Sequence, residues 1–200
     1  MAAVPKRRWF QFSLRTLLII VTILAVGPGG WLIYEQNQAR RQKESAAQLR
    51  KVGAEVYATP RWLWTLLEPD SPGTVVGVGL RYRKFSDVDL IPLSSLAELI
   101  WLDLNDTPVG DNGLVHLAGL RRLKRLRLDE TQVTDAGLFH LSGLKELEQL
   151  NLYKTQISDA GLANLAVLTN LEELNLQRTQ VTDEGVANLQ KALPKCRIAR

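Results

Sequence analysis

The stretch Leu123–Leu144, LKRLRLDETQVTDAGLFHLSGL, recurs along the chain with a period of 24 residues. Its starting leucine returns at Leu99, Leu123, Leu147 and Leu171 without insertion. Counted from each start, leucine falls at offsets 3 and 5, threonine at 8, a β-branched residue at 10, aspartate at 12 and glycine at 14. Self-similarity at a fixed period of this length is typical of a solenoid, whose stacked copies bury a core that one copy cannot.

An additional, less regular copy begins one period earlier, at Val75. Asp87 keeps the aspartate position in this copy, whereas Arg83 replaces the threonine. We therefore expect five repeats over residues 75–193, closed by a C-terminal strand in residues 194–200.

Each recurring column predicts a structural role. Offsets 3 and 5 point to the same side of a strand, because strand side chains alternate. The threonine hydroxyl, if buried, must bond to the backbone. The aspartate is placed to accept from the N–H groups at the start of its own helix. The glycine permits a close approach of helix and strand, or an unusual backbone angle.

The pattern LxxLxLxxTxVTDxGLxxLxxL in Leu123–Leu144 resembles the leucine-rich-repeat family. The threonine stands where the cysteine-containing subtype commonly has Cys or Asn. With its FSLRTLL, AEVY and ALPKC segments, the whole chain resembles bacterial membrane-anchored proteins of this family. The resemblance implies an α/β fold: a right-handed curved solenoid with parallel strands on the concave face and short helices on the convex face, preceded by one N-terminal hydrophobic helix. It also implies binding of other proteins, without naming a ligand.

The N-terminal region predicts a membrane anchor. Residues 1–16 are basic, and Leu17–Tyr34 follows without any charge. A helix over residues 17–34 would cover about 27 Å, enough for a hydrocarbon core. The preceding positive charges favour a cytoplasmic N-terminus and repeats on the exported side of the membrane. The alternatives are a merely buried segment and a cleaved signal peptide, because Leu17–Val26 has the length of a signal-peptide core; cleavage would give a secreted repeat protein.

Residues 35–74 are expected to link the anchor to the repeats and to cap the stack. A polar helix is predicted up to about residue 52, followed by a short strand at residues 55–57. Thr59 and Pro60 are typical of the start of another helix.

Charge and composition exclude several classes of function. Residues 1–74 hold ten basic and five acidic residues, whereas residues 75–200 hold fifteen and sixteen. The basic excess thus belongs to the N-terminal region, and a nucleic-acid partner is not expected. Cys196 is the only cysteine, so no intramolecular disulfide can form, and its expected role is to fill the end of the core.

No enzyme, cofactor or metal site is expected. The chain lacks GxxxxGK[ST], HExxH and GxSxG motifs. The aspartate column has no other recurring oxygen ligands beside it, and His116 and His140 lack a third ligand.

The strand surface that faces away from the helices is the predicted binding surface. Tryptophan, tyrosine and arginine dominate binding hot spots. Neighbouring parallel strands lie about 4.8 Å apart, so Trp101 can stack with Arg125 and Asp103 can pair with Arg127. These residue types predict a membrane-tethered interaction module for a protein, a peptide or a glycan. The alternatives are that the side chains only solubilise the surface, or that the protein is a structural envelope spacer. The predicted partner-binding residues are Tyr82, Trp101, Asp103, Arg125, Arg127 and Tyr153.

Overall fold

The structure, a computed structural model, describes residues 34, 36–58, 75–80 and 85–200. The chain divides into two compact units, Met1–Gln38 and Ala39–Arg200. Of the first unit, only Tyr34 and residues 36–38 are described, and they are helical. Within the described part of the chain, no helix is both long and apolar enough to cross a membrane. The anchor predicted over residues 17–34 lies outside the described residues except for Tyr34, and the helix predicted after Thr59 lies wholly outside them.

The second unit is built on one sheet of seven strands in chain order. Strands β2 to β7 run parallel, and each pairs with the next in steps of 24 residues, as Leu102 does with Leu126. Strand β1 confirms the strand predicted at residues 55–57, but it pairs antiparallel with β2. The strands are β1 (Glu55–Ala58), β2 (Val75–Gly79), β3 (Trp101–Asp103), β4 (Arg125–Arg127), β5 (Gln149–Asn151), β6 (Glu173–Asn175) and β7 (Arg197–Ala199).

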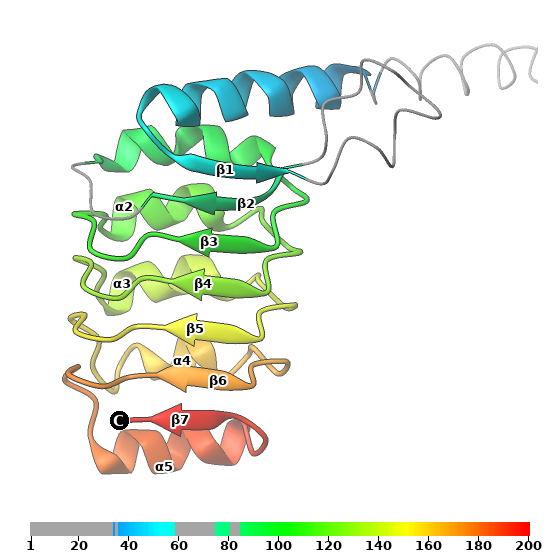
Figure 1. The fold of residues 1–200 in the computed structure, drawn as a ribbon. Helices are drawn as coiled ribbons and strands as arrows, with labels where there is room; N and C mark the ends of the chain where they lie inside the picture. The colour runs from blue at the N-terminus through cyan, green and yellow to red at the C-terminus, as the bar shows by residue number, and fades with distance from the viewer. Residues whose placement is uncertain (1–33, 35, 59–74, 81–84) are drawn as a thin grey trace, which may run out of the picture. The chain divides into compact units, whose positions relative to one another are not determined.

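From β2 to β7, short helices lie between consecutive strands of the chain and cover one side of the sheet (Figure 1). Together the two layers form the curved solenoid that the repeats predict. Residues 39–51 are also helical, and Ser45 of this helix shares a 2.7 Å hydrogen bond with Ser95. The helical layer consists of the 3₁₀ helices η2 (Asp87–Ser95), η3 (Val115–Leu117) and η4 (Phe139–Leu141), and of α2 (Asp111–Leu114), α3 (Asp135–Leu138), α4 (Leu162–Leu165) and α5 (Asp183–Ala192).

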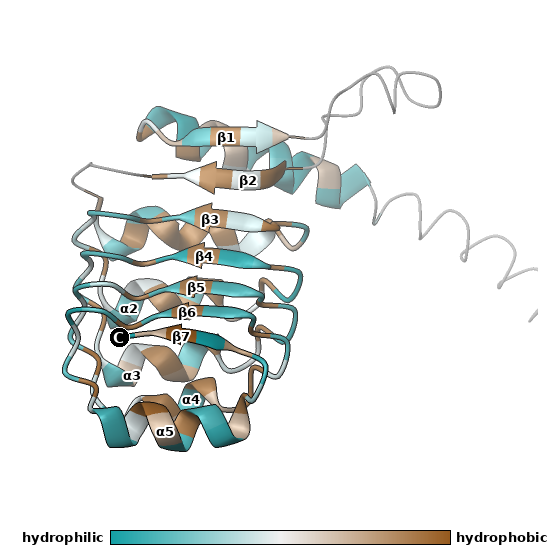
Figure 2. Ribbon diagram, turned by 60° about the horizontal axis from the view of Figure 1, so that its bottom comes forward, coloured by the Kyte–Doolittle hydropathy of each residue, from teal (hydrophilic) through white to brown (hydrophobic). Residues whose placement is uncertain are grey.

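The core lies between the sheet and the helices. Leucines at offsets 3 and 5 are at most 2% exposed in the four regular repeats, and Leu138, Leu141 and Leu144 of the helical side are fully buried. This burial confirms the two predicted core faces, and each such side chain contributes about 1.5–3 kcal/mol. In Figure 2, strands β4 to β6 are mainly hydrophilic, whereas α3 and α4 carry apolar segments. Cys196 is buried at the end of the core, where burial and then Glu173 raise the pKa of its thiol to about 11.

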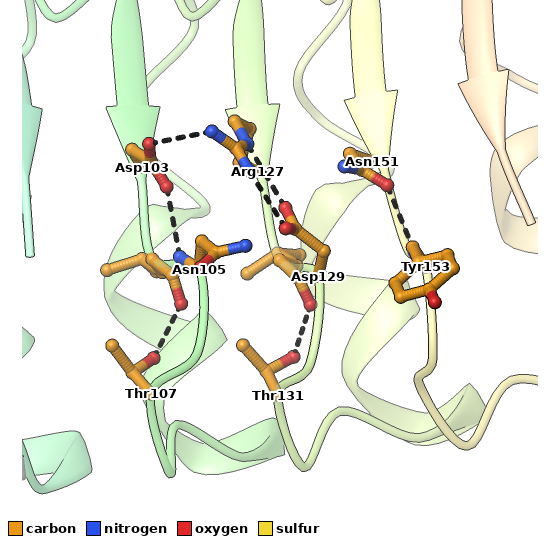
Figure 3. A network of polar contacts seen from close by, with 10 residues as sticks. Asp103, Asn105, Thr107, Arg127, Asp129, Thr131, Asn151 and Tyr153 are labelled. Atoms are coloured by element: carbon orange, nitrogen blue, oxygen red, sulfur yellow. Dashed lines mark hydrogen bonds and ion pairs between the residues drawn. The ribbon is translucent and has the colours of Figure 1, made fainter. Parts of the chain in front are cut away.

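The threonine column is buried and satisfied by the backbone, as predicted. Thr107, Thr131 and Thr155 are 3–5% exposed. Each hydroxyl donates to the carbonyl oxygen three residues earlier at 2.7 Å, and Figure 3 shows this bond for Thr107 and Thr131. This bond closes the turn that follows each strand, so the column fixes where the strand ends.

The aspartate column does not cap its own helix, and that prediction is wrong. The Asp111 carboxylate reaches into the next repeat, where it accepts from the Thr134 backbone N–H at 2.8 Å and from the Thr134 hydroxyl at 2.7 Å. Asp159 makes the same pair of bonds to Thr182. The helix caps are instead Thr134 and Thr182, which accept from Ala136 and Gly185. The aspartates therefore join consecutive repeats.

The glycine column leaves space for these aspartates. A Cβ atom at Gly113 would lie 2.7 Å from Asp87 Oδ1, closer than real Cβ atoms approach, and one at Gly137 would overlap Asp111 Oδ1. The close approach that the sequence predicts is thus to the preceding repeat's carboxylate, not between helix and strand. The left-handed backbone angles fall elsewhere, at offset 7: the φ angles of Asp106, Glu130, Lys154 and Arg178 are 51–59°.

Candidate functional site

The concave face of the sheet carries a shallow hollow of about 450 Å³. Because strand side chains alternate, offsets 2 and 4 face this hollow while the leucines between them face the core. The side chains of strands β3 to β7 are therefore presented in parallel rows at equal spacing. The polar and aromatic residues that line the hollow are Trp101, Arg125, Arg127, Gln149, Asn151, Glu173, Asn175 and Arg197.

Trp101 is half-buried and packs against the start of the sheet. Its ring meets Tyr57 edge to face, with centroids 5.6 Å apart and an interplanar angle of 70°. A Cβ atom at Gly77 would lie 2.9 Å from Trp101 Cε3, and one at Gly79 would lie 3.5 Å from Trp101 Cη2. The ring thus lies across two glycines of β2. The sequence predicted that Trp101 stacks with Arg125, but the ring packs against Tyr57 instead. Trp101 therefore forms one wall of the hollow and is not a free anchor.

Arg127 joins two buried carboxylates, and its predicted pairing with Asp103 is confirmed. Arg127 donates to Asp103 Oδ2 at 3.2 Å and holds Asp129 in a two-pronged contact, Nε to Oδ1 at 3.1 Å and Nη2 to Oδ2 at 2.9 Å (Figure 3). Asp103 and Asp129 are only 1% and 5% exposed. Removing a partner from a buried pair leaves an uncompensated charge, so this trio orders the middle of the sheet.

Arg125 differs from Arg127 in having an exposed side chain and no ion pair within the described part of the chain. On the next two strands, β5 and β6, Asn151 Oδ1 accepts from the Tyr153 N–H and Asn175 Oδ1 accepts from the Gln177 N–H, both at 3.0 Å. The backbone uses the amide oxygens, so the amide NH₂ groups remain as donors toward a ligand. The middle of the hollow is consequently rich in hydrogen-bond donors.

The predicted site residue Tyr153 is not among the residues that line this hollow. Tyr153 is half-buried and receives Arg178 over its ring, 5.5 Å from the centroid. Tyr82 lies outside the described residues.

Ion pairs between adjacent repeats flank the hollow. Lys124 and Glu148 are joined at 2.6 Å, as are Lys154 and Glu130. Hydrogen bonding to these carboxylates raises the pKa of both lysines. Exposed pairs of this kind contribute little to stability. These pairs neutralise the charges that they join, whereas Arg125, which lines the hollow, forms no ion pair within the described residues.

Residues 167–189 match the family described as Leucine Rich repeat. This match covers about one repeat length of the chain. Among solved structures, an internalin of Listeria monocytogenes is 28% identical over 55% of this chain and 30% of its own, with a TM-score of 0.48. Internalin C2 of the same organism is 33% identical over 55% of this chain and 46% of its own, with a TM-score of 0.41.

A plant peptide hormone receptor, RGFR1 in complex with RGF2, is 14% identical over 55% of this chain and 22% of its own, with a TM-score of 0.37. This chain spans less than half the length of each of these three structures. No curated protein matches it.

Sequence reasoning missed several residues that shape the hollow. Gln149, Asn151 and Asn175 stand in the columns that face it, but a search for aromatic and arginine anchors passes over them. Arg197 could have been found by counting 24 residues from Glu173, with which it forms an ion pair. Asp129 had no such signal, because its pairing depends on the side-chain conformation of Arg127.

Proposed function

We propose that the leucine-rich-repeat unit is an interaction module that binds a protein or peptide segment on its concave face. The observation that carries this proposal is the hollow of about 450 Å³ that is lined in part by exposed Arg125, which forms no ion pair within the described residues. Arginine is enriched at binding hot spots, and a guanidinium beside donor amides suits a segment with carboxylate or carbonyl acceptors.

The charge distribution supports binding over a surface that only solubilises the domain. The edges of the face are neutralised by ion pairs between repeats, such as Lys124 with Glu148. Arg125 instead leaves an unneutralised guanidinium in the hollow, where it can meet an acidic group of a ligand. The Trp101 ring is packed against Tyr57, so a stacking platform for a glycan is a weaker possibility than a peptide site. We therefore favour an acidic peptide segment as the ligand.

Site-specific photo-cross-linking tests this proposal even though the partner is unidentified. A photoreactive amino acid replaces Gln149, in the hollow, or Gln180, an exposed control residue outside it. We expect one discrete cross-linked protein from position 149 and none from position 180. No product from either position, or the same products from both, would contradict concave-face binding and favour the structural spacer.

We also propose that residues 17–34 tether the module to a membrane, with the repeats on the exported side. The support is the uncharged run from Leu17 to Tyr34 and the basic residues before it. The full chain should then resist extraction by carbonate and keep its N-terminal peptides in mass spectrometry. A mature chain that begins near Gly30 would overturn the tether and favour the secreted form.

A further inference from the structure

The convex side of the solenoid carries a surface without charge. The outward positions of the helical layer fall at offsets 13, 16, 17, 19 and 20, between the buried leucines at offsets 15, 18 and 21. In the four repeats that start at residues 75, 99, 123 and 147, these positions contain no Asp, Glu, Lys or Arg. Charges return in the fifth repeat, with Glu184 and Lys191. We call the twenty uncharged positions, from Val88 to Val167, the convex patch.

An apolar ridge runs along the convex patch. Ile91, Val115 and Phe139 stand at offset 16 of successive repeats, and their exposed fractions are 52%, 48% and 65%. Val88 and Val167, at opposite ends of the patch, are 65% and 43% exposed. Single exposed apolar residues are ordinary, but aligned ones on an uncharged surface are typical of interaction sites.

A column of small residues lies beside this ridge. Offset 19 holds Ser or Ala in all four repeats of the patch, and offset 20 holds glycine in two of them, Gly119 and Gly143. No atom lies within 4 Å of a Cβ placed at Gly119, so this position is open. The ridge and the column of small residues repeat with the same period, so bulky side chains of one such surface can lie against small side chains of another.

We propose that the convex patch binds a second copy of this chain in an antiparallel, two-fold arrangement. The ridge of each copy would lie against the column of small residues of the other, which is the self-complementarity that a two-fold interface requires. An uncharged surface can meet itself without bringing like charges together. Its twenty positions are also close to the ~20–30 residues per side of a stable protein interface.

The charges that border the convex patch favour a second copy over a lipid surface. Offset 22 holds Arg121 and Lys145 in the two middle repeats of the patch. The adjacent column, at offset 23, holds Glu98, Arg122 and Glu146. Binding to anionic lipids is strengthened by clusters of basic residues, whereas this border is mixed in sign. A mixed border instead provides the polar rim that surrounds a protein interface.

Photo-cross-linking of the full chain in intact cells tests the two-fold contact. Two copies with different epitope tags are co-expressed, each with p-benzoylphenylalanine in place of Phe139. The control carries it at Gln132, which is exposed and outside the convex patch. Irradiation at position 139 should give a product of about twice the chain's mass that contains both tags, and position 132 should not.

A second substitution separates contact from chance collision. Val115→Asp should lower the yield from position 139 by at least about tenfold, because each copy then buries an unpaired charge. Gln132→Asp should leave the yield unchanged, and both variants should keep the parent's thermal melt, since both residues are exposed. The absence of a doubly tagged product, cross-linking only to another protein or to lipid, or equal yields from positions 139 and 132 would overturn the proposal.

Discussion

Replacing Gly161 by alanine tests the link between consecutive repeats. A Cβ atom at this position would overlap Asp135 Oδ1 and lie 3.0 Å from both Asp135 Cγ and Leu138 Cδ1. Asp135 accepts from the Ser158 backbone N–H at 2.8 Å and also from the Ser158 hydroxyl. The added methyl group would therefore displace the carboxylate and break both bonds.

The expected cost follows from these contacts. A hydrogen bond to a charged group contributes about 1.5–3 kcal/mol, and the half-buried position of Asp135 favours the low end for each bond. Alanine returns up to about 1 kcal/mol by restricting the unfolded chain, because the φ and ψ angles of Gly161, −72° and −25°, are ones that alanine adopts without strain. We expect Gly161→Ala to lower the free energy of unfolding by about 2 kcal/mol, which corresponds to a decrease of about 4–8 °C in Tm for a domain of this size.

Urea unfolding of the full chain, followed by circular dichroism, measures this cost. Gly119→Ala is the matched control, because nothing lies within 4 Å of its Cβ position; it should be neutral or stabilise by up to about 1 kcal/mol. In an Asp135→Ala background, Gly161→Ala should cost less than about 1 kcal/mol, since the clashing carboxylate is gone. A neutral Gly161→Ala, or costs that simply add in the double variant, would refute the proposed coupling.

Three further predictions concern individual side chains. Thr155→Ala should cost about 1–3 kcal/mol, because the Leu152 carbonyl loses its buried donor, whereas exposed Gln156→Ala should cost less than about 0.5 kcal/mol; equal costs in urea unfolding would contradict the role of the threonine column. Bonds from the Thr182 hydroxyl and backbone N–H lower the pKa of Asp159, so its contribution is present above its unfolded pKa of about 3.9 and is lost as the pH falls below that value. Melts between about pH 5 and about pH 2 should thus show a shallower acid loss for Asp159→Asn than for the parent, and an unchanged slope would argue against the bond. The Cys196 thiol, with its pKa raised to about 11, should resist alkylation at neutral pH in the folded chain and react in urea; rapid labelling of the folded chain would show that it is accessible.

The sequence predicts those parts of the fold that depend on contacts repeated in every copy. The roles of the leucine and threonine columns can be predicted because each column implies burial, and a buried hydroxyl needs a hydrogen bond to the backbone. The sequence predicts that the aspartate column accepts hydrogen bonds, but it does not predict which group donates them. Asp111 could serve its own helix or the next repeat, and the choice depends on the separation of the stacked copies.

The binding surface is predictable as a surface but not residue by residue. Its facing columns follow from strand alternation. The role of Trp101 does not, because it depends on the antiparallel pairing of β1, which places Tyr57 beside it. Arg125 and Arg127 are two residues apart and are the same residue type, yet only Arg127 is held by two buried carboxylates. That distinction requires side-chain positions, which no pattern of residue types specifies.

The affinity of the full chain for the partner captured at position 149 tests the proposed function most directly. Calorimetric titration compares the parent with Arg125→Ala and with the exposed control Gln180→Ala, and a thermal melt accompanies each. We expect Arg125→Ala to weaken binding by about 2 kcal/mol, roughly thirtyfold in Kd, with the parent's Tm retained, and Gln180→Ala to bind as the parent does. Unchanged affinity in Arg125→Ala, or equal weakening in Gln180→Ala, would contradict the concave face as the binding surface.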